Sequence, residues 1–139
     1  MKERVEKAAI QLPHPCELIY APRELLKHML WSDVAISSSG LTKYELALTG
    51  TPTLLTSIDS AHDLINKDFT LTGAAIDLGI HSELTPSRIN SSLQALLENE
   101  IQRMELSKKG QSWIDADGAS RVVDELEKLK GKSHDRQGI

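Results

Sequence analysis

The segment that decides the fold is VAISSSGLTKYELALTG, residues 34–50. Residues 34–37 form a short apolar run, which is typical of a strand buried inside a parallel sheet. Small residues from Ser37 to Gly40 then predict a tight turn, and residues 41–48 predict a helix that ends at Gly50, a common helix C-terminal residue. A strand, a turn and a helix in this order are the repeating unit of an α/β domain.

The same alternation continues along the rest of the chain. Strands are predicted at residues 17–20, 34–37, 53–56 and 74–79, and helices at residues 1–9, 22–30, 41–48, 61–71, 85–97, 100–113 and 119–129. We therefore predict a Rossmann-like, three-layer α/β/α domain with a parallel sheet of about four strands. The domain should cover residues 1–130, beginning partway into such a fold, and residues 131–139 should form a flexible tail.

Composition excludes several classes of function. The 139 residues are 40% hydrophobic and 26% charged, as in ordinary globular proteins. The net charge of -4, without a basic stretch carrying interleaved aromatics, argues against a nucleic-acid partner. No run approaches the ~20 apolar residues of a membrane span, and no signal peptide is recognisable, so we expect a cytoplasmic protein. The lone Cys16 cannot form an internal disulfide and is expected to be a small buried residue.

The histidines and short motifs predict neither a metal site nor a catalytic triad. No two histidines have His-x-x-x-His spacing, no second cysteine exists, and the Gly-x-Ser-x-Gly motif is absent. Loop, helix-surface or tail positions without a role are expected for His14, His28, His81 and His134. We expect no metal and no cofactor.

The serine-rich turn is the first candidate for a binding site. In an open parallel sheet, ligands bind beyond the carboxyl ends of the strands, where a helix N-terminus offers free N–H groups to phosphate. The candidate residues are Ser38, Ser39, Gly40, Leu41 and Thr42. Gly40 can adopt a positive φ, and Ser39 or Thr42 can cap the helix or bind an anion. The alternative is a capped turn that binds nothing, and spacing alone does not decide between the two.

Glu45 is the second candidate. It lies in the first or second turn of the helix that follows the serine turn. A carboxylate can accept two hydrogen bonds from a vicinal diol, so Glu45 could bind a ribose. The residues alone favour the alternative, a surface glutamate that interacts with the helix dipole.

The block of residues 37–52 resembles the C-terminal domains of two related GT-B groups. One is the bacterial N-acetylglucosaminyltransferase that makes lipid II, and the other is the UDP-sugar hydrolase of the pseudaminic acid pathway with its spore-coat polysaccharide relatives. Both carry a small-residue turn, a threonine, two variable positions, Glu-Leu or Glu-Ile, and Gly-x-Pro. In this sequence Thr42, Glu45, Gly50 and Pro52 stand at those spacings.

The resemblance extends over residues 19–126. Ala61-His62, eleven residues before Gly73-Ala74-Ala75, occupies the place of a glutamine-containing dipeptide in these families. Residues 117–123 resemble the Asp-Gly-x-Gly-Ala-x-Arg-Val segment of the hydrolase group, which favours that branch.

The resemblance implies a UDP-sugar site in the C-terminal half of a GT-B fold that lacks its first strand. Amides of residues 39–41 would contact uracil or the diphosphate, Glu45 would bind the ribose hydroxyls, and His62 would lie near the pyrophosphate or the sugar. With the resemblance added, ribose binding becomes the preferred interpretation of Glu45.

Two departures bear on activity. The glycine-rich first turn of the family's domain and the whole N-terminal domain, which supplies the acceptor site and catalytic base, are missing, and Ser39 replaces a usual glycine. We expect the UDP-sugar-binding half of a glycosyltransferase or UDP-sugar hydrolase of surface polysaccharide or sialic-acid-like sugar biosynthesis, inactive alone. Its partner would be a separate N-terminal-half chain or a further copy. The alternatives are a non-catalytic nucleotide-binding module, a degenerate remnant, or a sequence whose natural start is not Met1.

Overall fold

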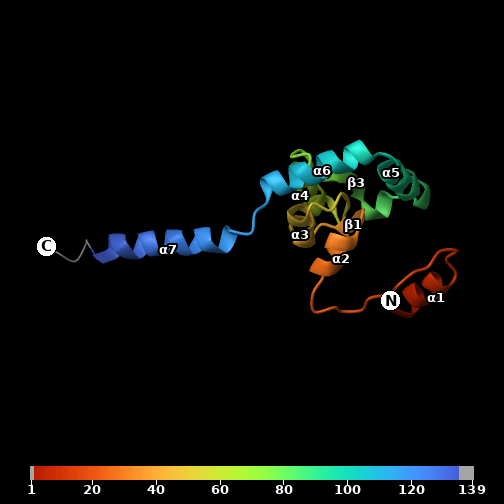
Figure 1. The fold of residues 1–139 in the computed structure, drawn as a ribbon, viewed down its shortest axis with the longest axis horizontal. Helices are drawn as coiled ribbons and strands as arrows, with labels where there is room; N and C mark the ends of the chain where they lie inside the picture. The colour runs from red at the N-terminus through yellow and green to blue at the C-terminus, as the bar shows by residue number, and fades with distance from the viewer. Residues whose placement is uncertain (1, 135–139) are drawn as a thin grey trace.

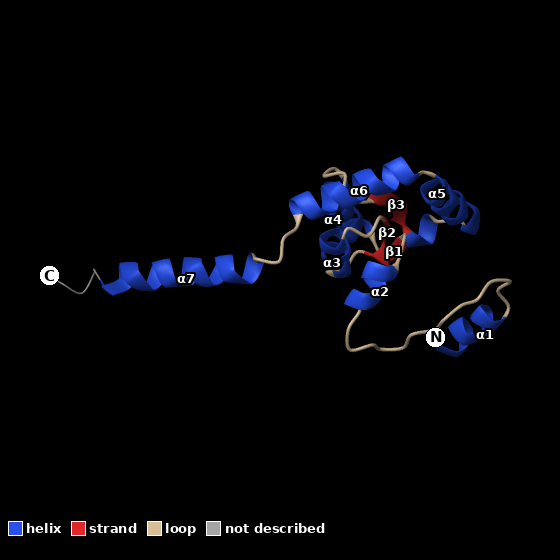
Figure 2. Cartoon of the chain, viewed as in Figure 1, coloured by secondary structure: helices blue, strands red, loops and turns tan. Residues whose placement is uncertain are grey.

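The computed structural model describes residues 2–134 (Figures 1 and 2). Its elements in chain order are α1 (Lys2–Ile10), α2 (Leu26–Trp31), β1 (Ala35–Ser38), α3 (Thr42–Thr49), β2 (Thr53–Ser57), α4 (Ser60–Thr70), β3 (Ile76–Ile80), the short 3-10 helix η1 (His81–Glu83), α5 (Pro86–Glu98), α6 (Glu100–Trp113) and α7 (Gly118–His134). Figure 2 shows the three strands at the centre of the globular body, with helices packed around them.

The sheet is parallel, in the order β1-β2-β3. Because each pair of parallel neighbours needs a crossover, α3 connects β1 to β2 and α4 connects β2 to β3. The predicted Rossmann-like α/β class is confirmed.

The middle strand, β2, contributes to the core on both of its faces. Leu54 and Leu55 are adjacent and fully buried, and consecutive side chains of a strand point to opposite faces. The cluster around Leu55 contains Ala47 of α3, Phe69 of α4, and Ala74 and Ala75 from the segment just before β3. The cluster around Leu54 contains Leu78 of β3, Leu96 of α5 and Leu106 of α6. Two helical layers therefore enclose the sheet.

Helix α6 also approaches α3 very closely. A Cβ atom added to Gly110 would lie 2.9 Å from the carbonyl oxygen of Ala47 and 3.1 Å from its Cα. Only a residue without a side chain permits this contact between two backbones.

The strand predicted at residues 17–20 is wrong. This segment is an irregular loop whose side chains Leu18, Ile19 and Tyr20 are exposed, and the described sheet has three strands. Its apolar pattern is that of a strand, but a strand also needs a neighbour to hydrogen-bond, and the segment pairs with none. Cys16, at the start of this loop, is exposed rather than buried.

Two further expectations need correction. The first helix after that loop begins at Leu26 instead of residue 22. Strand β1 is only half covered, with Ile36 exposed, because it lies at the edge of the sheet and has a neighbour on one side only.

The C-terminal helix is longer than the sequence predicts. Helix α7 continues through residues 131–134, which were expected to belong to the tail, while residues 135–139 lie outside the described part. Figure 1 shows α7 projecting away from the globular body. The domain boundary at residue 130 stays a prediction.

Replacing Gly110 by alanine should destabilise the protein by about 1–3 kcal/mol, because the added methyl group must separate α6 from the Ala47 backbone. The loss should outweigh the gain of up to ~1 kcal/mol in helix propensity. Urea denaturation measures the effect. Gly118→Ala is the control, since its Cβ would meet only Arg121, at 3.9 Å. Equal stability of the two variants would contradict the role of the close contact.

Candidate ligand-binding site

Three turns meet at the carboxyl edge of the sheet, one after each strand. The hydroxyl of Ser39, in the turn after β1, donates to the Thr56 carbonyl at 3.4 Å and accepts from the Ile58 N–H at 3.4 Å. Nδ1 of His81, after β3, lies 3.3 Å from the Ser57 carbonyl oxygen. The turn after β1 and the turn after β3 are therefore both hydrogen-bonded to the end of β2 and the residues that follow it.

The serine turn leads directly into α3. The Gly40 N–H donates to the Ser38 carbonyl at 2.8 Å, and the Tyr44 N–H donates to the Leu41 carbonyl at 2.9 Å. No side chain caps this helix, so the predicted capping by Ser39 or Thr42 is wrong. Ser39 instead bonds to the chain after β2, which leaves the first N–H groups of α3 without a side-chain acceptor.

Gly40 lies in an open part of the turn. Positive φ values occur at Gly50, Gly73 and Gly79 but not at Gly40, so the turn does not use the positive φ that a glycine permits there. A Cβ atom added to Gly40 would meet no atom within 4 Å. A ligand can therefore approach this backbone closely.

The N-terminus of α4 is already occupied by a carboxylate. Asp59 caps the helix by accepting from the His62 N–H at 2.9 Å, and Nδ1 of the half-buried His62 ring lies 2.8 Å from the same Oδ1. Bonds from the His62 backbone and then from its ring lower the pKa of Asp59. The carboxylate of Asp59 can therefore accept from both the backbone N–H and the ring of His62.

Glu45 lies in the first turn of α3 and is exposed. It lines a cavity of about 460 Å³ between α2 and α3 together with Pro22, Arg23, Glu24, Leu25, Leu26, Met29, Leu48 and Thr49. The serine-turn residues do not line this cavity. The structure therefore brings His62 to the edge that carries the serine turn, and places Glu45 on the side of α3 that faces α2.

A buried cation lies beneath the first turn of α3. Lys43 is 3% exposed, and its Nζ donates to the side-chain carbonyl of Asn66 in α4 at 2.9 Å. Asn66 in turn donates to the Ser57 hydroxyl at 3.0 Å. Burial lowers the pKa of Lys43. This chain of contacts joins the start of α3 to α4 and to the end of β2.

Lys43 and His81 are two residues of this edge that were not predicted as site residues from the sequence. The positions buried on α3 are Lys43, Leu46 and Ala47, at helical spacing, so the periodicity of the helix could have indicated a buried lysine. His81 directly follows a strand of a parallel sheet, and this position alone indicates the carboxyl edge.

Fold and edge together define a Rossmann-like α/β domain with a polar carboxyl edge. No family model matches the chain, and no solved structure matches it significantly. The chain is similar to the spore coat polysaccharide biosynthesis protein SpsG of Bacillus subtilis (strain 168), with 26% identity over 113 residues. These residues are 81% of this chain but 33% of SpsG, so the chain spans about a third of the length of this relative. The similarity supports a distant relation to a protein that is named for polysaccharide biosynthesis.

Neither a membrane-spanning helix nor a metal-binding cluster occurs among the described residues. No helix among residues 2–134 combines the length and the apolarity needed to cross a membrane. In the same part of the chain, no group of three or more His, Cys, Asp or Glu side chains is placed to hold a metal ion.

Lys43→Met should change how stability depends on pH. Because burial lowers the pKa of Lys43 below its ordinary 10.5, the native state binds fewer protons than the unfolded chain as the pH approaches that value. Lys43 thus makes the wild type gain stability with rising pH. The unfolding free energy of the wild type minus that of the variant should increase between about pH 7 and about pH 9.5. Urea denaturation at both pH values checks this, and a constant difference would contradict it.

Proposed function

We propose that this chain binds UDP or a UDP-sugar at the carboxyl edge of its sheet, as the nucleotide-sugar-binding half of a glycosyltransferase or UDP-sugar hydrolase. The observation that carries the proposal is the open serine turn leading into the uncapped N-terminus of α3. Free N–H groups and the helix dipole together favour a phosphate group at such a position.

The serine turn would hold the diphosphate. The exposed Ser38 hydroxyl and the N–H groups of Leu41 and Thr42 are the donors, and Gly40 leaves room for the ligand. The Ser39 hydroxyl is engaged with the end of β2, so Ser39 would act by fixing the turn in place. His62 would contact the diphosphate or the sugar from the adjacent turn.

Glu45 would bind the ribose hydroxyls. It follows Thr42 by three residues on α3, which is less than one helical turn of about 5.4 Å. The Glu45 carboxylate would therefore lie close enough to contact a ribose whose diphosphate is bound at the start of the helix.

The similarity to SpsG supports this direction. The name of that protein places it in polysaccharide biosynthesis. A nucleotide-sugar site fits such a role, and chemistry on the sugar would then require a second polypeptide or a further copy of this chain to complete the active site.

A non-catalytic nucleotide-binding module is the second candidate. The state of the acid–base groups at the edge favours it. Asp59 already caps α4 and His62 is bonded to Asp59, so both side chains are engaged within the protein. Release of UDP from a UDP-sugar by the chain with its partner distinguishes the enzyme from the module.

UDP should bind the full chain with a Kd of about 0.1–1 mM. In an NMR titration, the amide signals of Gly40, Leu41 and Thr42 should shift, and uridine without phosphates should shift them far less. Gly40→Val should weaken binding by covering the turn, while its unfolding free energy stays within about 1 kcal/mol of the wild type, since no atom is close. An absence of saturable shifts at several millimolar UDP would refute the proposal.

Glu45→Gln should weaken UDP binding about ten- to a hundredfold, because a charge-assisted hydrogen bond to the diol is lost. The fold should be unaffected, since Glu45 is exposed. Calorimetry with UDP and 2′-deoxy-UDP measures the effect, and the variant should discriminate less between them. Glu105→Gln, an exposed site on α6, is the control. If both variants bind both nucleotides like the wild type, Glu45 does not contact the ribose.

A further inference from the structure

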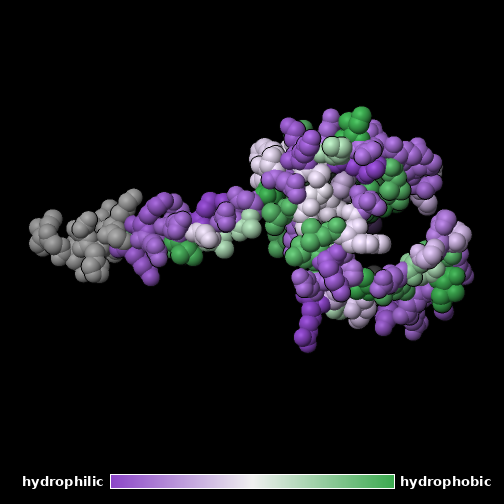
Figure 3. Space-filling model, viewed as in Figure 1, coloured by the Kyte–Doolittle hydropathy of each residue, from purple (hydrophilic) through white to green (hydrophobic). Residues whose placement is uncertain are grey.

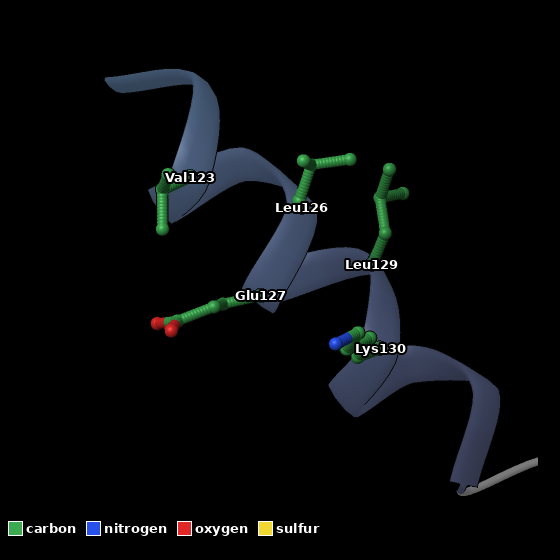
Figure 4. A pocket seen from close by; sticks show the side chains of 5 residues that line it. All are labelled: Val123, Leu126, Glu127, Leu129 and Lys130. Atoms are coloured by element: carbon green, nitrogen blue, oxygen red, sulfur yellow. The ribbon is translucent and has the colours of Figure 1, made fainter. Parts of the chain in front are cut away.

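Helix α7 carries an apolar stripe that nothing in the described chain covers. Val122, Val123, Leu126 and Leu129 are each between 52% and 62% exposed. Figure 4 shows Leu126 and Leu129 projecting from the same side of the helix, with Glu127 directed elsewhere. In Figure 3, apolar atoms follow one side of α7 and polar atoms the other. Such a one-sided helix is stable when a partner buries its apolar face.

The spacing of the stripe is that of a coiled coil. Ala119, Val122, Leu126 and Leu129 follow one another at intervals of three, four and three residues, which are the a and d positions of two consecutive heptads. The small Ala119 permits close approach at the end of the helix nearest the body. Polar side chains fill the positions opposite this seam: Ser120, Arg121, Asp124, Glu127 and Lys128.

The charges beside the seam fit a second copy of the same helix in parallel orientation. With Leu126 at position a, Lys130 is at e of the same heptad and Glu125 is at g of the preceding one. In a parallel pair, a g residue faces the e residue five positions later on the other helix, so each Glu125 meets the Lys130 of the other copy. In the single chain Glu125 pairs with Lys128 at 2.6 Å, and both side chains are largely exposed, so this pair costs little to exchange.

We propose that α7 is a self-association helix through which two copies of this chain form a short parallel coiled coil. Its projection from the body leaves the seam accessible to a second copy (Figure 1). Two heptads bury few side chains, so the dimer is concentration dependent. The nucleotide site lies on the globular body, and self-association does not depend on it.

The test is the mass of the full chain by sedimentation equilibrium over a concentration series. We expect a rise from 15.4 kDa toward twice that value. Leu126→Glu should raise the dimer dissociation constant at least about tenfold by placing a charge in the seam. Thermal unfolding of the globular body should not change. A monomer at every concentration, or a dimer that Leu126→Glu leaves intact, overturns the proposal.

Charge exchange tests the parallel orientation. Glu125→Lys and Lys130→Glu should each weaken self-association about three- to tenfold through like-charge contacts, and an equimolar mixture of the two variants should regain the wild-type affinity. Asp124→Lys makes the same charge change as Glu125→Lys but away from the seam, and should leave the affinity unchanged. If the mixture is no tighter than either variant alone, the parallel pairing is wrong.

Discussion

The structure depends on the burial of β2 from both sides. Leu54 and Leu55 are fully buried on opposite faces, so each helical layer is anchored to the sheet through one of two adjacent residues. Truncating a buried leucine typically costs 2–5 kcal/mol, which is a large part of the stability of a domain of this size.

Burial of β2 also determines where a ligand can bind. Because helices cover both faces of the sheet, polar groups of the strand become reachable only at its end. There the carbonyl groups of Thr56 and Ser57 need hydrogen-bond donors, and Ser39 and His81 lie within bonding distance of them. The hydrogen bonds that these carbonyl groups accept are thus the same contacts that hold the turns after β1 and β3 against the end of β2.

The sequence predicts the elements whose pattern is local. The apolar runs of β1, β2 and β3 and the helical periodicity between them suffice for the α/β class. Pairing is not local, so residues 17–20, with the pattern of a strand, remain a loop. The same limit applies to Lys43, whose acceptor Asn66 lies 23 residues away, and to the Ser39 hydroxyl, which bonds to a carbonyl 17 residues away instead of capping its own helix.

The two helix N-termini at the carboxyl edge differ in charge, and this difference bears on where an anion would go. At the start of α4, the carboxylate of Asp59 already accepts from the helix and offsets its dipole. At the start of α3 no side chain does so, and the buried Lys43 adds a positive charge within the first turn. A phosphate placed at α4 would meet a negative group at close range, whereas at α3 it would meet N–H groups that no side chain caps. Of these two helix starts, that of α3 is therefore the more favourable place for a phosphate.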